Sequence, residues 1–218
     1  MTQQEPRRQE ESRLQLPGEV AHRLKETDIR ACFVNRRSRR NYVHGTMTKR
    51  QLAYILYHTM RKQRDEKVYH TAIPSAGNRH PLDVELLLLR VLDVEKGLYR
   101  YDPITHTLVL RRRFDELEST IEKALPTQKF VKDAALIYAI TARREKMVQY
   151  VGEEAADKLI YLEAGHLGQQ IMLLSESLEL GTCPVAEFDR IETDRLFSVD
   201  EGQHAIYLFP MGPRADLF

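Results

Sequence analysis

The sequence predicts a domain that combines β-strands with helices, and three observations indicate this. Short apolar runs without alternation are typical of buried strands, and they occur at 84–92, 134–141 and 203–209. Two alternating segments, 97–101 and 107–110, flank the turn pair Asp102-Pro103 and predict a hairpin. A long apolar pattern over 153–180 predicts a helix of about 40 Å, the width of a whole domain.

Composition narrows the class of protein. The chain has 218 residues, 42% of them apolar and 30% charged, which suits one substantial domain or two small ones. Lys and Arg number 33 against 32 Asp and Glu, and this near balance argues against a nucleic-acid-coating protein. No apolar run reaches 18 residues and the first residues lack a signal core, so we expect a cytoplasmic protein without a membrane span.

Cysteine and histidine patterns exclude two kinds of site. The two cysteines, Cys32 and Cys183, form no Cys-x-x-Cys pair, which argues against a disulfide scaffold or a cysteine zinc site. Cys183 has no neighbouring base in the sequence, so catalysis through this thiol is disfavoured. The eight histidines show no metal-ligand spacing, and we expect no metal site.

The outer elements follow from local signals. Residues 1–30 are polar and mixed in charge, and we expect a loose N-terminal arm that orders only against a partner surface. A helix over 46–60 is predicted, with Thr46 or Thr48 as its cap. A second helix is predicted over 115–125, where Pro126 ends it.

The long helix carries an apolar seam with heptad-like spacing, formed by Ile160, Ala164, Leu167, Ile171, Leu174 and Leu178. Gly165 and Gly168 each cost about 1 kcal/mol of helix propensity, a cost that close approach of another backbone could offset. Two interpretations stay open. The helix packs against its own copy, or it is the core helix of a monomer.

An arginine tract, residues 36–40, is the first candidate binding segment. It is either a solvated basic run or an anion site, because guanidinium groups and the Ser38 hydroxyl suit phosphate oxygens. The chain has no phosphate-binding glycine loop. A nucleotide-like cofactor would therefore need side chains to hold its phosphate.

Two further segments are candidates for a site. The loop 74–81 has a proline at each end, with Gly77 and small polar residues between, and is either a connector or a built surface. Gly181 and Pro184 end the long helix. The segment that follows either only stops the helix or offers backbone groups to a flat ligand.

Five segments, in this order, resemble the flavin-dependent nitroreductase superfamily and within it the SagB-type dehydrogenase branch. They are RRSRRNY (36–42), PSAGNRHPLDVELL (74–87), GLYRYDP with HTLVL (97–110), YLEAGHLGQQIMLL (161–174) and LGTCPVAEFD (180–189). The resemblance implies an α+β, nitroreductase-like fold over residues 31–218, with a mainly antiparallel mixed sheet flanked by helices. It also implies an intertwined homodimer that binds FMN at the subunit interface, with the long helix as the dimer core.

The resemblance also implies roles for particular residues. Arg36 and Ser38 match residues around the FMN phosphate and ribityl chain, Arg37 matches a further cofactor contact, and Arg40 matches the basic residue near flavin N1 and O2. The loop that covers the ring from the other subunit corresponds to Pro74, Ser75, Ala76, Gly77 and Asn78. The segment that lines the ring corresponds to Pro184, Val185 and Ala186. Arg214 is a looser phosphate candidate.

The implied activity is hydride transfer through flavin N5 in two half-reactions, with NADH or NADPH as donor and a small molecule as acceptor. Azoline dehydrogenases of the SagB type resemble one another in a Lys-Tyr pair before the long helix, which is linked to proton removal from the ring being oxidised, so the resemblance implies a catalytic role for Tyr150. Tyr150 fits the tyrosine, but Gln149 occupies the lysine position and cannot act as a base, and Lys146 is a substitute candidate. The alternatives are a peptide azoline dehydrogenase in a modification complex and a non-catalytic flavin-fold subunit. DNA binding through the arginine tract is a third and weaker idea.

Overall fold

The computed structural model describes residues 12–18, 27–65 and 68–217. A seven-stranded sheet has the order β1-β6-β5-β4-β7-β9-β8, and all of its strand pairs are antiparallel. Its strands are β1 (Arg13–Gln15), β4 (Leu82–Leu88), β5 (Gly97–Asp102), β6 (Thr107–Arg112), β7 (Leu136–Arg143), β8 (Leu180–Thr182) and β9 (Gln203–Pro213). A separate hairpin joins β2 (Gln63–Asp65) and β3 (Val68–His70).

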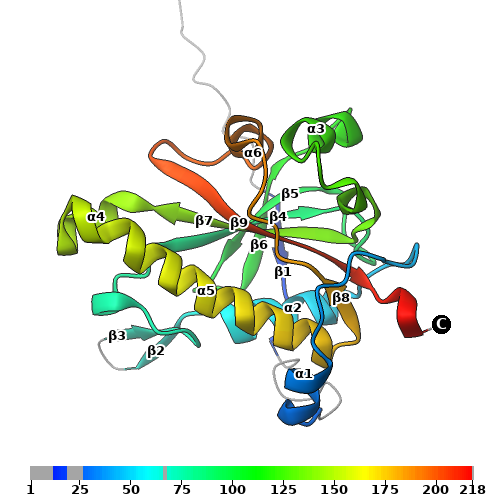
Figure 1. The fold of residues 1–218 in the computed structure, drawn as a ribbon, viewed down its shortest axis with the longest axis horizontal. Helices are drawn as coiled ribbons and strands as arrows, with labels where there is room; N and C mark the ends of the chain where they lie inside the picture. The colour runs from blue at the N-terminus through cyan, green and yellow to red at the C-terminus, as the bar shows by residue number, and fades with distance from the viewer. Residues whose placement is uncertain (1–11, 19–26, 66–67, 218) are drawn as a thin grey trace, which may run out of the picture.

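Helices cover both faces of this sheet (Figure 1). They are α1 (Ile29–Asn35), α2 (Lys49–Thr59), α3 (Leu117–Ala124), α4 (Arg144–Val151), α5 (Glu153–Ser177) and α6 (Arg190–Leu196), with 3₁₀ turns at Ala76–Asn78, Lys129–Asp133 and Ala215–Leu217. The expected α+β architecture, an antiparallel sheet flanked by helices, is confirmed. The predicted hairpin is present. The predicted long helix is present too, but it ends at Ser177, and Gly181, expected to cap it, lies in β8 instead.

Two apolar clusters lie on opposite faces of the sheet. On β7, Tyr138 and Ile140 belong to the cluster under α2 and α5, whereas Ile137 and Ala139 belong to the cluster under α3 and α6. Successive residues of a strand point to opposite faces, so a strand covered on both sides is apolar throughout. This is why the predicted strand segments lacked alternation.

The cap of α2 shows how the sequence sets an element boundary. Thr48 accepts a hydrogen bond from Gln51 N, and the Gln51 side chain accepts one from Thr48 N, which together form a capping box. The predicted cap is therefore confirmed at Thr48 and not at Thr46. Helix α3 begins at Leu117, two residues after the predicted start.

The apolar seam of α5 faces the chain's own sheet. Ile160, Leu167 and Ile171 are at most 3% exposed and belong to the core between α5 and the sheet. A Cβ at Gly168 would lie 2.8 Å from Phe209 Cζ, so this glycine lets α5 approach β9. The seam thus agrees with the second of the two open interpretations, a core helix within one chain.

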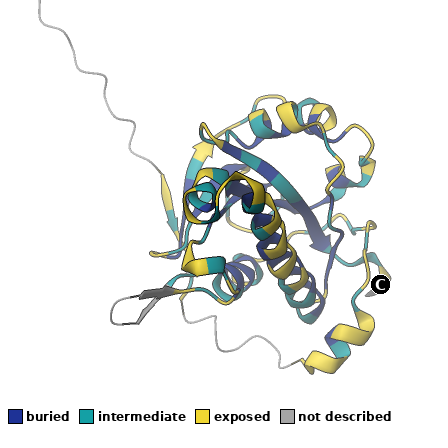
Figure 2. Cartoon of the chain, turned by 60° about the vertical axis from the view of Figure 1, so that its left-hand side comes forward, coloured by how far each residue is buried: buried dark blue, intermediate teal, exposed yellow. Residues whose placement is uncertain are grey.

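The outer side of α5 is a different surface, visible in yellow in Figure 2. Tyr161 is 62% exposed and Leu162 is 52% exposed. Gly165 lies beside them, and a Cβ there would meet nothing within 4 Å. This outer face is the part of α5 that is accessible to another molecule.

The predicted N-terminal arm, residues 1–30, is only partly described. Residues 13–15 form β1, which pairs with β6, and Leu16 is buried. These residues order against the chain's own sheet, so the expectation that the arm orders only on a partner surface was wrong for them. Residues 1–11 and 19–26 of the arm lie outside the described residues. Among those described, no helix is long and apolar enough to cross a membrane.

Candidate functional site

The arginine tract leaves α1 and runs along the end of the sheet. Arg39 N donates to Thr182 O at 3.0 Å, and Tyr42 Oη donates to Pro210 O at 3.0 Å. Tyr42 also forms a β-bridge with Arg214. These backbone and side-chain contacts fix the tract beside β8 and the C-terminal part of β9.

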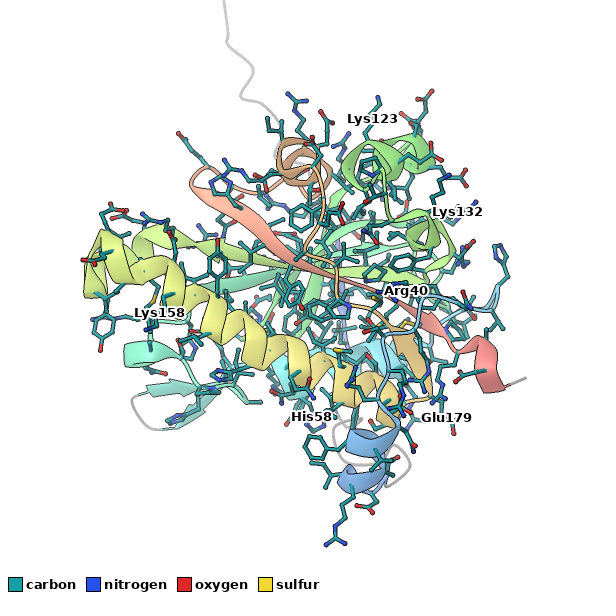
Figure 3. All side chains as sticks on the ribbon, viewed as in Figure 1. Arg40, His58, Lys123, Lys132, Lys158 and Glu179 are labelled. Atoms are coloured by element: carbon teal, nitrogen blue, oxygen red, sulfur yellow. The ribbon has the colours of Figure 1, made fainter. Side chains whose placement is uncertain are left out.

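The side chains of the tract differ in their surroundings. Arg36 is half-buried, while Arg37, Ser38 and Arg40 are exposed. Arg37 donates to two backbone carbonyls, those of Val34 and Arg36. The Arg40 guanidinium lies 5.9 Å from the centre of the Phe130 ring (Figure 3). A pocket of about 480 Å³ opens here, lined by Ser38, Arg39, Arg40, Asn41, Ala215 and Asp216.

Arg214, the looser phosphate candidate, is held by carboxylates. Its guanidinium donates to Glu176 at 2.8 Å and to both oxygens of Asp216 at 2.8 Å. Arg39 shares both acids, with its Nη1 2.5 Å from Glu176. The two arginines hold the pKa of Asp216 well below its usual range. Sequence reasoning singled out neither Arg39 alone nor these acids, because no pattern in the chain joins the tract to α5.

The edge segment, residues 182–186, begins with the last residue of β8 and extends the sheet edge beside the tract. Val185 exchanges two backbone hydrogen bonds with Leu208, at 2.8 and 2.9 Å. Burial raises the pKa of the Cys183 thiol, against the opposing effects of Arg40 and a hydrogen bond with Ser38. Pro184 is half-buried and Ala186 is exposed at the far end of this edge segment. The structure therefore brings the tract and the edge segment together.

Ala186 borders a second pocket, of about 510 Å³. It is lined by Ala142, Arg144, Asp157, Ile160, Tyr161, Ala186, Phe188, Arg190, His204, Ala205 and Ile206. Aromatic and charged side chains thus meet where the edge segment ends. Among the described residues, no group of three or more His, Cys, Asp or Glu side chains could hold a metal ion.

The loop 74–81 has a strained and specific backbone. Gly77, Asn78 and His80 have φ of 57°, 55° and 47°. Ser75 Oγ donates to Glu163 Oε2 at 2.7 Å and accepts from His80 N at 2.8 Å, so one hydroxyl joins both ends of the loop to α5. Pro74 is exposed, and Ala76 is half-buried against the core. Side-chain hydrogen bonds therefore hold this loop in one conformation, so it does more than connect two elements.

Tyr150 packs on this loop. A Cβ at Gly77 would lie 2.5 Å from Tyr150 Cζ, and the Arg79 guanidinium lies 4.8 Å from the centre of the Tyr150 ring. Gln149 instead donates to Glu145 on the exposed side of α4. Lys146 donates to His80 O at 3.0 Å, which places the substitute lysine at the loop and Gln149 away from it.

Burial dominates the electrostatics of this second cluster. It raises the pKa of Glu163 to about 7, against the opposing effects of the Ser75 hydrogen bond and the Lys146 charge. Burial also lowers the pKa of Lys146. An acid and a base whose pKa values move toward neutrality thus lie beside Ser75 and Tyr150.

The two clusters lie at different points along α5. Glu163, near the middle of the helix, contacts the loop, and Glu176, near its C-terminal end, contacts the arginine tract, thirteen positions further along. At a rise of about 1.5 Å per residue this is about 20 Å. In Figure 1 the loop before β4 lies by the N-terminal half of α5, and β8 lies by its C-terminal end. One chain therefore does not bring the loop and the tract together.

Comparison with known proteins places the chain beside one family. The model of the "Nitroreductase family" matches residues 34–213. A curated relative from Methanocaldococcus jannaschii, named as a nitroreductase, is 29% identical over 93% of this chain and 97% of its own length. A crystal structure of a protein from Ralstonia eutropha, also named as a nitroreductase, has a TM-score of 0.76 at 22% identity. The match covers 93% of this chain and 90% of the Ralstonia chain. A longer Anabaena variabilis protein has a TM-score of 0.70 at 20% identity over 86% of this chain, which spans 38% of that chain.

Proposed function

The chain belongs to the nitroreductase family and is an oxidoreductase, and from this premise we propose that it binds FMN and transfers hydride in two half-reactions. The observation that carries the proposal is the hydrogen bond from Arg39 N to Thr182 O, which joins the arginine tract to the edge segment. This bond holds the guanidinium and hydroxyl donors of the tract beside Thr182, and the edge segment continues from Thr182 to Ala186. A phosphate-bearing flat cofactor needs these two kinds of surface.

The donor set fits the phosphate end of FMN. Ser38 lines a pocket with an exposed side chain, and Arg36 and Arg37 precede it in the tract. Charged hydrogen bonds from arginine to phosphate are short and strong. Arg214 and Arg39 are neutralised by Glu176 and Asp216, so we assign them to holding the tract and we assign the phosphate to Arg36, Arg37 and Ser38.

The edge segment fits the ring end. Thr182 pairs with Met211 and Val185 pairs with Leu208 on β9, so the segment is extended over roughly 10 Å at about 3.3 Å per residue. When bound, FMN supplies the hydride chemistry. Pro184, Val185 and Ala186 would orient the ring, and the Arg40 charge would favour negative charge developing beside it. The charge of Arg40 is thus the proposed catalytic contribution of the tract.

A second copy of the chain completes the site in this proposal. The loop of residues 74–78 lies about 20 Å along α5 from the tract, so it can cover a cofactor only from another chain. The exposed outer face of α5, with Tyr161, Leu162 and Gly165, supports a contact between copies. The homodimer is therefore part of the proposed function.

FMN binding is the first test. Purified protein should be yellow and release FMN on denaturation, and Arg36→Ala should weaken FMN binding by about 2 kcal/mol, which is a loss of charged hydrogen bonds. Arg30→Ala on α1 is the matched control, because Arg30 lies outside the tract. Colourless protein that takes up no added FMN would overturn the proposal, and unchanged affinity in Arg36→Ala would remove the assignment of that residue.

Peptide azoline oxidation is a second candidate, and one observation favours it. Tyr150 and Lys146 both contact the loop 74–80, so a lysine and a tyrosine stand together although Gln149 occupies the expected position. Oxidation of an azoline-containing peptide that Lys146→Met abolishes would support this candidate. A binding-only subunit is the remaining alternative. Steady-state oxidation of NADH or NADPH with a quinone acceptor would exclude it.

A further inference from the structure

Glu163 is a buried acid on α5 that the proposed mechanism does not use. It is 4% exposed, on the side of the helix that faces the protein interior. Its charged form is disfavoured there, so the position is costly for a residue that only fills space. We propose that Glu163 is a positioning residue that sets the conformation of the covering loop, residues 74–80, through Ser75; the loop's role in covering FMN rests on the proposed function.

The contacts make a short chain of hydrogen bonds. The Ser75 hydroxyl donates to Glu163 Oε2 at 2.7 Å, and it accepts from His80 N at 2.8 Å. Because a hydroxyl has one proton, donation to Glu163 orients its lone pairs toward His80 N. The carboxyl therefore determines whether Ser75 can join the two ends of the loop.

The loop needs such a constraint. Asn78 and His80 have positive φ, which is uncommon for residues other than glycine, although Asn and His adopt it more readily than most. A further polar support from outside the loop is Lys146, whose ammonium donates to His80 O at 3.0 Å. Glu163 from α5 and Lys146 from α4 thus hold the start and the end of the loop.

Charges around Glu163 agree with this role. Lys146 is the cation whose attraction favours its ionised form, and Asp83 and Arg143 in turn act on Lys146. Hydrogen bonding to Ser75 does not require a charge, because an amide oxygen accepts equally from a hydroxyl. Glutamine should therefore replace Glu163 in this function, and alanine should not.

Hydrogen exchange of the cofactor-free protein tests the inference directly. We expect the His80 amide to exchange at least 10-fold faster in Glu163→Ala and in Ser75→Ala, and at nearly the wild-type rate in Glu163→Gln. In the double variant Glu163→Ala/Ser75→Ala, the His80 amide should exchange no faster than in either single variant, because each substitution alone already breaks the same chain of hydrogen bonds. Ser175→Ala is the matched control, because Ser175 is a buried polar residue of α5 that bonds Ile171 O and does not touch the loop.

FMN affinity gives the second measurement. Glu163→Ala should bind FMN at least 10-fold more weakly, and Glu163→Gln should stay within about 2-fold of wild type. An unchanged His80 exchange rate in both alanine variants, or no rescue by glutamine, would overturn the inference. If Glu163→Ala did not fold, Glu163→Met, which keeps most of the side-chain volume but has no oxygen to accept from Ser75, would decide it by the same His80 exchange rate. Wild-type protein without FMN affinity would overturn the proposed function, while hydrogen exchange would still decide the role of Glu163.

Discussion

Gly77 occupies a position that combines two constraints. Its φ of 57° disfavours other residues, and the Tyr150 ring lies where a Cβ would stand. The Tyr150 side chain is partly exposed and its outer ring atoms make the contact, so the ring can move away. The glycine therefore fixes where Tyr150 lies more than it fixes stability.

Gly77→Ala should consequently change activity more than folding. We expect a loss of about 1 kcal/mol of unfolding free energy from the positive φ, and at least a 10-fold loss of turnover from displacement of Tyr150. Gly202→Ala is the matched control, with φ of 75°, open space around it and a position before β9, away from Tyr150. Urea denaturation and NADH-quinone turnover measure the two effects. Equal turnover in both variants would show that the contact of Tyr150 with the loop does not affect turnover.

The raised pKa of Glu163 also predicts that the stability of the folded protein depends on pH. Its pKa is raised from 4.5 to about 7, so between these values the folded protein retains a proton that the unfolded chain has lost. Its contribution to stability is therefore present below about pH 4.5 and falls as the pH rises to about 7. Glu163→Gln removes this effect. The variant should match wild type at pH 5 and exceed it at pH 8 by on the order of 2 kcal/mol in urea denaturation. A relative gain by wild type at pH 8 would contradict the assignment.

Among the elements, α5 joins the two clusters, and its C-terminal end holds the arginine tract. Glu176 is 8% exposed and contacts both Arg39 and Arg214, whose side chains are 14% and 12% exposed. Removing the acid from such a pair leaves buried charge without its partner. The position of the tract thus depends on one residue of a helix 137 residues away in sequence.

Glu176→Gln should destabilise the protein by about 2 kcal/mol and weaken FMN binding, because both arginines lose their buried partner. Asp216→Asn is the matched control, since Asp216 contacts the same arginines but its side chain is 51% exposed and ion pairs at such sites contribute little. Thermal unfolding and FMN titration measure both variants. An Asp216→Asn effect as large as that of Glu176→Gln would show that burial does not decide the contribution.

At the scale of the whole molecule, local sequence patterns predicted the helices and strands well but did not predict which distant residues contact one another. The apolar run of β7 and the Thr48 cap were recognisable because their causes lie within a few residues. The surface that covers the α5 seam could not be decided from sequence, because heptad spacing is the same whether that surface belongs to this chain or to another. The Glu163–Ser75 and Glu176–Arg39 contacts join residues distant in sequence, and no local pattern could reveal them.

The separation of the clusters makes the final prediction one about assembly. If a second copy supplies the covering loop, the outer face of α5 must lie in the contact, and Gly165→Arg should yield a monomer that no longer retains FMN. Arginine improves helix propensity by about 1 kcal/mol over glycine and meets nothing within the chain, so the variant should fold. Glu122→Arg on the exposed side of α3 adds a similar side chain away from α5 and should leave the dimer intact. Light scattering after size exclusion, with flavin absorbance, measures both properties. A dimeric, yellow Gly165→Arg protein would place the contact between copies elsewhere.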